Sequence, residues 1–403
     1  MDVQHIYDAG LCELCGTCVG VCPEGAISMA WDLDAGYVLR VDRALCTDCG
    51  TCIDVCPGDG FDYSDGAWWR ERNGDAPRRD FLGPWRTLHF GWASDPDVRH
   101  AGASGGVATA ILQGALAHGL IDAAVVIGMD PDNALAGRAL LARSADEVAA
   151  ARGSKYTTIN SNVLLRTVRE EPGRYAVVGL PCHLQGLRRA QKRLPVLRER
   201  VGFALGIFCG LTNLPRATWL AARRAGVDPD SITSVGYRGP GWPGGLRLTS
   251  RSGTVKEVPY PDYHDGFVGA WVPLRCRLCP DALAELADVS VGDAWLDRFS
   301  GTPGVSDLIV RTEAGERFME EIAPDRLTLE EATPDEMVAS QRETYHVKRD
   351  VMRGRLWLRR KAGRAAPDYP GLDCVASPTD KVAGIRDLAR EAAYRSAGRL
   401  LYR

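Results

Sequence analysis

The chain has 403 residues, with 49 Lys and Arg against 52 Asp and Glu, a net charge of −3 and a hydrophobic fraction of 45%. This length suggests two or three globular domains, and the near balance of charge disfavours a general nucleic-acid-binding protein, which presents a basic face. No stretch has the roughly 20 uncharged apolar residues of a membrane span, and residues 1–10 lack the basic and apolar regions of a secretory signal. We therefore expect a cytoplasmic protein with no nucleic-acid partner and no membrane span.

Two cysteine runs near the N-terminus share one spacing. Both read C-x2-C-x2-C-x3-C followed by Pro, and the fillers Cys-Gly-Thr-Cys and Val-Cys-Pro recur in both. In such runs three cysteines bind one corner of an iron–sulfur cube and the fourth reaches the other cube. Structural zinc is the alternative, but zinc modules usually show two separated CxxC pairs. The spacing therefore predicts two [4Fe-4S] clusters, one on Cys12, Cys15, Cys18 and Cys56, the other on Cys46, Cys49, Cys52 and Cys22.

The segment 5–60 resembles a bacterial-type ferredoxin with two [4Fe-4S] clusters, and we place a ferredoxin-like domain at 1–62. One departure is the sequence after the second run, Gly-Asp-Gly-Phe, where the first run has Glu-Gly-Ala-Ile. Residues 63–92 have no clear period and are rich in Trp, Arg, Gly and Asp. We expect them to be a linker on the surface of the next domain, with Trp68, Trp69 and Trp85 packed against it.

Residues 93–340 read as the main domain. Short apolar runs predict strands over 123–129, 175–180 and 203–208, and helical patterns occupy 107–118, 160–170, 184–192 and 217–225. Strands that alternate with helices predict an α/β domain with a parallel or mixed sheet. Residues 246–258 alternate around Ser252-Gly253, which predicts a hairpin.

Two short motifs in this domain could contact a ligand. Ser104-Gly105-Gly106 precedes the helix that starts at residue 107, where glycines admit a ligand and helix amides favour an anion. A plain N-cap by Ser104 explains this motif about as well. Lys155, in the Gly-Ser-Lys-Tyr turn at 153–156, could pair with a phosphate or lie beside a flavin ring; a surface turn is the alternative.

Four further cysteines could form a third four-thiolate site. Cys182 and Cys209 each follow a predicted strand, so they should be neighbours at one edge of the sheet, and the CxxC loop of Cys276 and Cys279 could complete the cage. We favour a third [4Fe-4S] cluster over zinc or unligated buried cysteines. Cys374 is then left alone in the tail.

Charged residues follow this CxxC loop. Asp281, Glu285 and Asp288 are spaced at i, i+4 and i+7, and we expect them to orient the loop more than to relay protons. The basic stretch 341–364 predicts a helical start to a C-terminal tail, 341–403. Such a run is typical of a solvated helix that closes a domain, and a partner-docking face is the alternative.

The order of six motifs resembles the coenzyme F420 hydrogenase/dehydrogenase beta-subunit family over about residues 85–340. The motifs are Ala-Ser-Gly-Gly-Val-Ala-Thr-Ala (103–110), Gly-Ser-Lys-Tyr (153–156), Gly-Leu-Pro-Cys-His-Leu-Gln-Gly-Leu-Arg (179–188), Gly-Ile-Phe-Cys-Gly (206–210), Tyr-Arg-Gly-Pro-Gly-Trp-Pro-Gly-Gly (237–245) and the segment 276–295 around Cys-Arg-Leu-Cys-Pro. The resemblance implies a larger mixed-sheet α/β flavin-binding domain with FAD beside a [4Fe-4S] cluster.

The same resemblance implies site residues. It makes Cys182, Cys209, Cys276 and Cys279 the ligands of the core cluster. It makes Lys155 the candidate catalytic residue and a flavin contact together with Ser104, Gly105, Gly106 and Tyr156. His183 stands where we would expect Gln and bears on the surroundings of the flavin or the cluster. Arg238 and Arg275, like Lys155, are candidates to hold phosphates or an anionic reduced flavin.

The implied function is that of an oxidoreductase. Electrons would pass between reduced coenzyme F420 and an acceptor through FAD and three clusters, to a ferredoxin-like protein or another oxidoreductase subunit. The family also includes 7-hydroxymethyl chlorophyll a reductase, so substrate transfers less well than fold. The alternatives are a ferredoxin-dependent flavin reductase acting on a C=C or C–O bond of an organic substrate, or a non-catalytic electron-transfer subunit of a larger complex.

Overall fold

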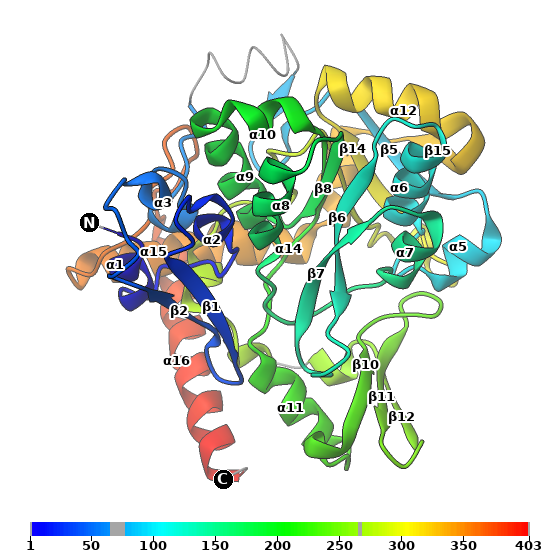
Figure 1. The fold of residues 1–403 in the computed structure, drawn as a ribbon. Coiled ribbons are helices and arrows are strands. Elements are labelled where there is room, and N and C mark those ends of the chain that lie inside the picture. The colour runs from blue at the N-terminus through cyan, green and yellow to red at the C-terminus, as the bar shows by residue number, and fades with distance from the viewer. Residues whose placement is uncertain (1, 65–76, 265–267, 402–403) are drawn as a thin grey trace.

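An eight-stranded mixed sheet forms the centre of the computed structural model, which describes residues 2–64, 77–264 and 268–401 (Figure 1). Its strand order is β15-β5-β14-β13-β9-β8-β6-β7. The central strands run parallel, and all of them except β13, which contains Ser290 and Asp293, are nearly continuous apolar runs, as expected for strands covered on both faces. They are β13 (Val289–Asp293), β9 (Val201–Ile207), β8 (Tyr175–Gly179) and β6 (Ala123–Met129). The flanking strands are β15 (Leu327–Glu331), β5 (Thr87–Ala93), β14 (Ser306–Val310) and β7 (Gly137–Ala142).

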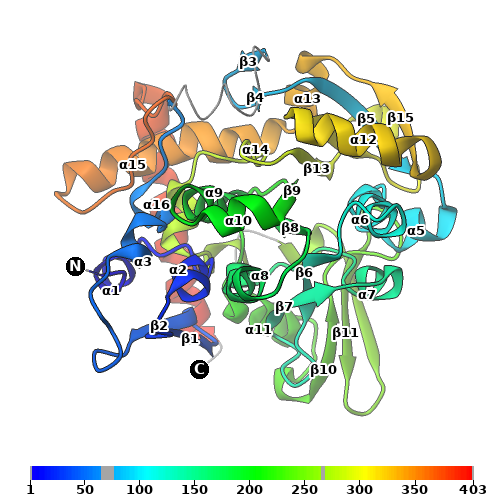
Figure 2. The same ribbon diagram turned by 45° about the horizontal axis from the view of Figure 1, so that its top comes forward.

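Helices cover both faces of this sheet (Figure 2). One face packs against α8 (Leu165–Glu170), α9 (Pro181–Arg193) and α10 (Pro195–Arg200). The other packs against α6 (Val107–Ala117), α7 (Ala145–Ala150) and α12 (Glu313–Arg326), with α5 (Pro96–Ala101) leading into α6. The structure thus confirms the mixed-sheet α/β class that the alternating pattern predicts.

The strands and the hairpin predicted for this domain are present, and its first strand begins at Thr87, before the expected start at residue 93. The predicted strands at 123–129, 175–180 and 203–208 are β6, β8 and β9 within a few residues. The predicted hairpin is β11 (Gly245–Ser250) and β12 (Val255–Pro259), which join β10 (Ile232–Gly236) in a separate three-stranded sheet beside α11 (Pro215–Arg224).

The predicted linker at 63–92 is wrong at its C-terminal end. Residues from Thr87 form β5, which pairs with β14 and β15 and buries Leu88 and Phe90, so this segment belongs to the large sheet. Just before it, β3 (Arg78–Arg79) and β4 (Gly83–Pro84) form a short hairpin. Trp85 packs against a buried apolar cluster, while Trp68 and Trp69 lie outside the described residues.

The N-terminal unit contains both cysteine runs. Its elements are α1 (Gln4–Asp8), α2 (Thr17–Val21), the hairpin of β1 (Ile27–Asp32) and β2 (Gly36–Val41), α3 (Thr51–Asp54) and the 3-10 turn η1 (Pro57–Asp59). The unit shares one apolar core with α8 and α9. Its α2 lies directly on the 3-10 turn η2 (Ser161–Leu164), because a Cβ on Gly20 would stand 2.2 Å from the Asn162 carbonyl oxygen.

Arginines of the main domain bind carbonyl oxygens of the N-terminal unit. Arg169 donates to the Val21 oxygen (2.7 Å), Arg189 to the Cys56 and Gly60 oxygens (2.6 and 2.8 Å), and Arg275 to the Pro57 oxygen (2.9 Å). Val21 is the last residue of α2, where carbonyls lack intrahelical partners and carry partial negative charge. Together these guanidinium groups fix the unit on the main domain.

The C-terminal tail is helical, as predicted, but only part of its basic stretch is solvated. It follows α13 (Pro334–Ser340) and comprises α14 (Arg342–His346), the π-helical turn η8 (Val347–Val351), α15 (Met352–Lys361) and α16 (Pro378–Leu401). Lys348, Arg349 and Arg355 are buried, and Arg355 pairs with Asp387 of α16. No helix within the described residues has the length and apolar character to cross a bilayer.

The buried Arg188–Asp288 pair provides a test of the packing between α9 and the sheet. Arg188 donates to Asp288 Oδ2 (3.2 Å) and to the Leu286 oxygen (2.9 Å), and both side chains of the pair are almost fully buried. Arg188→Met leaves a buried carboxylate without its cation, and we expect it to lower the free energy of unfolding by about 3–5 kcal/mol. Urea denaturation followed by circular dichroism measures the loss. Arg143→Met, which removes an exposed pair with Glu171, should cost less than about 1 kcal/mol; equal losses would contradict the assignment.

Candidate functional site

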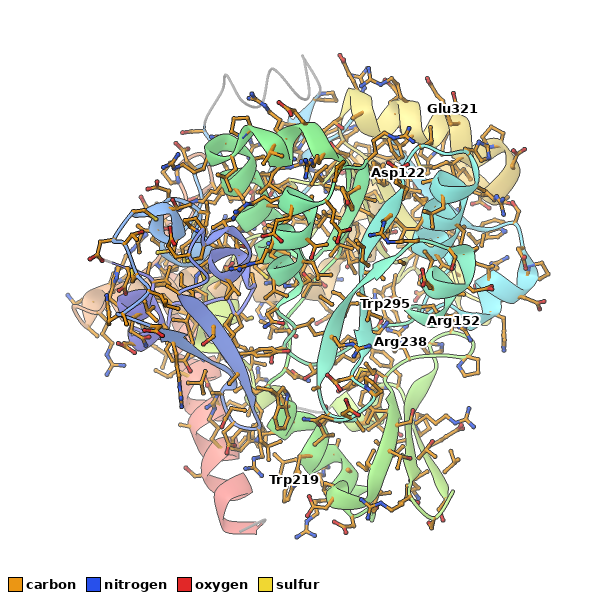
Figure 3. All side chains as sticks on the ribbon, in the orientation of Figure 1. Asp122, Arg152, Trp219, Arg238, Trp295 and Glu321 are labelled. Atoms are coloured by element: carbon orange, nitrogen blue, oxygen red, sulfur yellow. The ribbon has the colours of Figure 1, made fainter. Side chains whose placement is uncertain are left out.

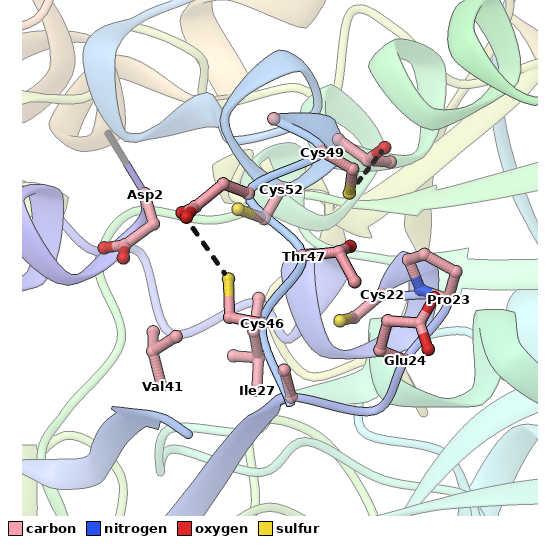
Figure 4. Close-up of a pocket in the computed structure, with 14 residues that line it drawn as sticks. Asp2, Cys22, Pro23, Glu24, Ile27, Val41, Cys46, Thr47, Cys49 and Cys52 are labelled. Carbon is pink, nitrogen blue, oxygen red and sulfur yellow. Dashed lines mark hydrogen bonds between the residues drawn. The ribbon is translucent and has the colours of Figure 1, made fainter. Parts of the chain in front are cut away.

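Two cavities in the N-terminal unit are lined by cysteines. One, of about 440 Å³ and open to solvent, is lined by Cys46, Cys49 and Cys52 of the second run and by Cys22 of the first (Figure 4). The other, of about 330 Å³, is lined by Cys12, Cys15 and Cys18 of the first run and by Cys56 of the second. Each cavity therefore takes three cysteines from one run and the last cysteine from the other. This grouping matches the crossed pattern that the spacing predicts.

Glycines shape the two cysteine turns. Gly16 and Gly50 cap α2 and α3 with φ of 81° and 75°, a left-handed conformation that glycine adopts without strain. The next turn of helix then carries Cys18 or Cys52. Burial raises the pKa of Cys12 to about 12 and of Cys15 to about 11. A metal cluster must therefore displace protons from these thiols to bind them.

The structure also brings the other four cysteines together. Cys182 and Cys209 follow the carboxyl ends of the neighbouring strands β8 and β9, and Cys276 and Cys279 lie in and after the 3-10 turn η6 (Leu274–Leu278). Cys182 is within electrostatic reach of Cys209 and Cys276, and Cys276 of Cys209 and Cys279. We call these four residues the core cysteine group.

Protein surrounds the thiols of the core cysteine group. Desolvation is the main cause that raises the pKa of each of these thiols, for Cys209 to about 11. Cys279 is buried, and Cys182, Cys209 and Cys276 are half-buried. Across the described residues, no three His, Cys, Asp or Glu side chains converge on a point as they would around a single metal ion.

A buried ion pair lies between the second cavity and the core cysteine group. Glu13 lines that cavity, and its Oε1 is 2.9 Å from the Arg275 guanidinium. Cys182 is within electrostatic reach of both Glu13 and Cys15. The core cysteine group is therefore the direct neighbour of the cavity that Cys15 lines. Arg275, a sequence candidate for a phosphate, is instead fully buried in this pair and in the docking of η1.

Arg238 is the centre of a second cluster, at the carboxyl end of β13. It donates to Asp293 Oδ1 (2.7 Å), to the Tyr156 hydroxyl (3.1 Å) and to the Ala103 carbonyl oxygen (3.0 Å). Burial opposes its charge, but Asp293 and Tyr156 outweigh burial and hold the pKa of Arg238 above its ordinary value. The structure thus places two sequence candidates, Tyr156 and Arg238, side by side, next to the backbone that leads into Ser104.

Aromatic rings surround this guanidinium. Its carbon lies 4.7 Å from the centre of the Tyr260 ring and 5.5 Å from that of Trp295 (Figure 3). Trp242 packs against Trp295 and donates from Nε1 to Asp293 Oδ1 (2.9 Å). Trp295 is 38% exposed, so the rings form a partly open platform at the sheet edge. Flat aromatic rings beside a fixed cation suit a planar ligand with acidic groups.

The glycine turn before α6 approaches the same edge. Ser104 Oγ donates to the Val305 oxygen (2.8 Å), and the Gly105 N–H donates to Ser306 Oγ (3.1 Å). Gly106, with φ of 73°, is the residue that caps α6, and no side chain caps that helix. The alternative of an N-cap by Ser104 is therefore wrong. The first amides of α6 have no side-chain cap, as at helix ends that bind anions.

The Lys155 side chain forms hydrogen bonds with nearby backbone. Lys155 Nζ donates to the carbonyl oxygens of Ala151, Arg152 and Gly153 at the end of α7. Burial and then Arg152 lower the pKa of Lys155 to about 7. The role of Lys155 beside a flavin stays a prediction.

His183 tightens the start of α9. Its Nδ1 accepts from the Leu180 N–H (3.2 Å) and its Nε2 lies 2.9 Å from the Ile159 oxygen, to which it donates in the matching tautomer. Burial lowers the pKa of His183 to about 4, so the ring is neutral at pH 7. His183 therefore fixes the backbone next to Cys182, and a contact with the flavin stays a prediction.

The sequence analysis does not identify several residues of these sites. Asp293, Trp242 and Trp295 stand inside the motifs at 237–245 and 276–295, yet nothing local marks them as partners of Arg238. Glu13 lies between Cys12 and Cys15, and in the sequence the cysteine spacing draws attention away from its carboxylate. The expected structural role of Asp281 and Asp288 agrees with their contacts: Asp281 accepts from the Glu285 N–H and Asp288 from the Ala204 N–H (2.8 Å).

Family models match most of the chain. The model "Coenzyme F420 hydrogenase/dehydrogenase, beta subunit N-term" covers residues 88–166, and the corresponding C-terminal model covers 173–335. A 4Fe-4S dicluster domain model covers residues 11–59.

Known proteins with these domains are similar over long stretches. The chain is 26% identical over 249 residues to coenzyme F420 hydrogenase subunit beta of Methanothermobacter thermautotrophicus, which covers 60% of this chain and 82% of that protein. It is 26% identical to a subunit of the F(420)H(2) dehydrogenase of Methanosarcina mazei, covering 82% and 88%. A chain in the structure of the F420-reducing [NiFe] hydrogenase complex of Methanosarcina barkeri has the same fold, with a TM-score of 0.54, 21% identity and coverage of 68% and 92%.

The glycines of the two cysteine turns give a matched test of how the N-terminal unit docks. A Cβ at Gly16 would lie 2.7 Å from the Asn160 oxygen, whereas a Cβ at Gly50 would meet nothing within 4 Å. Both substitutions by Ala carry the left-handed backbone cost of about 1–2 kcal/mol. Gly16→Ala adds a clash with η2 and should lower the free energy of unfolding by more than Gly50→Ala does. Denaturation of both variants under one anaerobic condition measures the difference, and equal losses would show that Gly16 does not contact η2.

Proposed function

Because the chain belongs to the coenzyme F420 hydrogenase/dehydrogenase beta-subunit family, we propose that it is an iron–sulfur flavoprotein that transfers electrons between reduced coenzyme F420 and a redox partner protein. The observation that carries this proposal is the pair of cavities whose cysteines cross between the two runs. Each offers four thiols to one [4Fe-4S] cluster. Relatives of the chain are subunits of F420-dependent oxidoreductases by name, which supports a redox partner subunit here.

We assign three clusters to twelve thiols. The second cavity would hold one cluster on Cys12, Cys15, Cys18 and Cys56, the first cavity one on Cys46, Cys49, Cys52 and Cys22, and the core cysteine group a third. Contacts support this order from the surface inward. Cys49 is exposed at the rim of the first cavity, Cys18 is within electrostatic reach of Cys52 across the two cavities, and Cys15 neighbours Cys182 of the core.

The edge of the sheet around Arg238 suits a flavin nucleotide, and we propose FAD there. The uncapped amides of α6 are donors for phosphate oxygens, Arg238 places a positive charge next to the backbone that leads into that helix, and the aromatic platform can stack on a planar ring. Bound FAD would supply two-electron hydride chemistry and single-electron exchange with a cluster. The chain's own part is to fix Arg238 through Asp293 and Tyr156, and to bring Ser104 and Ala103 against the same edge.

The cofactor content tests this assignment directly. After anaerobic purification we expect about twelve iron atoms, about twelve labile sulfides and one FAD per chain, since each cube holds four irons. Cys279→Ser should lower iron to about eight while FAD remains bound, because it removes one ligand of the core cysteine group alone. Iron analysis and flavin release by acid measure both. Zinc in place of iron, or a colourless chain, would contradict the proposal.

Arg238→Met tests the flavin site without touching a thiol. The substitution removes the cation that contacts Asp293, Tyr156 and the Ala103 oxygen, and we expect FAD content to fall at least tenfold while iron stays near twelve. Arg247→Met, in an exposed pair on the separate three-stranded sheet, is the matched control and should keep its FAD. Full FAD content in Arg238→Met would place the flavin elsewhere.

Anaerobic mixing separates the proposed substrate from the alternatives. Reduced coenzyme F420 should bleach the flavin and cluster absorbance of the holoprotein within the mixing time. Bleaching by reduced ferredoxin and not by reduced F420 would favour a ferredoxin-dependent reductase of an organic substrate. No bleaching by either would favour an electron-transfer subunit that works only inside a complex.

A further inference from the structure

Lys348 is a buried cation with no ordinary partner. Only 2% of the surface of Lys348 is exposed. Among the described residues, none forms a hydrogen bond or an ion pair with its amine. An isolated ammonium group is costly to bury in protein, so an environment that keeps it must offer negative charge.

The geometry of the tail explains why Lys348 faces inward. Lys348 and Arg349 lie in η8, a single π-helical turn between α14 and α15, and such turns occur at functional sites because they redirect side chains. This turn packs against η6, which carries Cys276. Arg349 donates to the Pro280 oxygen, directly after Cys279. The π-turn is therefore fixed on the CxxC loop, and Lys348 is held next to it.

The groups around the Lys348 amine are the thiols of the core. Cys279, Cys209 and Cys276 are its strongest favourable electrostatic neighbours, followed by Asp281. In return, Lys348 is the strongest opposite charge acting on each of these three thiols. The nearby carboxylates have other cations: Glu13 pairs with Arg275, and Asp281 lies near Arg311.

We infer that Lys348 supplies the positive charge that balances the core cysteine group and so raises the reduction potential of a cluster bound there. This rests on the proposed function. Four thiolates on a [4Fe-4S] core carry net negative charge, and each added electron increases it, so a fixed cation at short range stabilises the reduced state. Lys348 acts through the thiols and not on a substrate. It lies in the tail at 341–403, beyond the family models, which end at residue 335.

A redox titration of the intact protein tests this role. The signal of the core cluster is identified by electron paramagnetic resonance as the one that Cys279→Ser loses. In Lys348→Met we expect the equilibrium constant for reduction of that cluster to fall at least tenfold, which is about 59 mV for a one-electron couple. Lys348→Arg keeps the charge and should stay within threefold of the wild type. Lys361→Met, an exposed lysine at the end of α15, is the matched control and should not change the potential.

The outcomes separate this role from a structural one. Lys348→Met with twelve irons and an unchanged core potential would overturn the inference. Loss of the core irons from both Lys348→Met and Lys348→Arg would also overturn it, because packing and not charge would then matter. Loss from Lys348→Met alone would support charge balance through retention of the cluster. If the wild type holds only eight irons, the proposed core cluster is absent and this inference is overturned, while the two proposed N-terminal clusters remain supported.

Discussion

Charge that is buried must be balanced inside the protein, and this constraint organises the structure. The interior holds guanidinium and ammonium groups that a sequence reading would place on the surface, and each meets negative charge or carbonyl oxygens. Arg188 meets Asp288, Arg275 meets Glu13, Arg238 meets Asp293, and Lys348 meets the core thiols. Breaking such a pair costs more than making it gains. These pairs therefore act as fixed points, and the cysteines and the aromatic rings around Arg238 are positioned relative to them.

The same constraint ties the N-terminal unit to the main domain as one structure. A ferredoxin-like segment on a flexible linker would hold its cavities at variable distance from the core. Here Arg275 binds carbonyls of η1 and Arg189 binds the carbonyls of Cys56 and Gly60 on either side of it, and Gly16 and Gly20 bring α2 into backbone contact with η2. The side chain of Cys182 lies within electrostatic reach of Cys15. The cysteines of the N-terminal unit and the core cysteine group are therefore close together and held at a fixed distance. That arrangement suits electron transfer between fixed sites.

Local patterns predict the features of this protein that local physics decides. The apolar strands β6, β8 and β9 and the hairpin of β11 and β12 each depend on spacing within a few residues, and the structure has them where the sequence predicts. What the sequence could not reveal depends on contacts between distant residues. Thr87–Ala93 is a strand because β14 and β15 flank it. Asp293 matters because Arg238 lies across from it, 55 residues away in sequence.

The C-terminal tail lies outside the family models, yet it contacts both the N-terminal unit and the CxxC loop of the main domain. One part of it pairs with the N-terminal unit: the Phe61 N–H donates to the Asp368 oxygen (3.1 Å), the Asp368 N–H to the Asp59 oxygen (2.8 Å), and the Tyr63 N–H to the Pro370 oxygen (2.7 Å). Another part, η8, lies on the CxxC loop. A single stretch of chain thus contacts the segment after Cys56 and the loop of Cys276 and Cys279. Arg349 of the tail is buried and pairs with Asp80, which precedes the large sheet. Departure of the tail would break this pair, so the tail belongs to the same folded unit as the cysteines it covers.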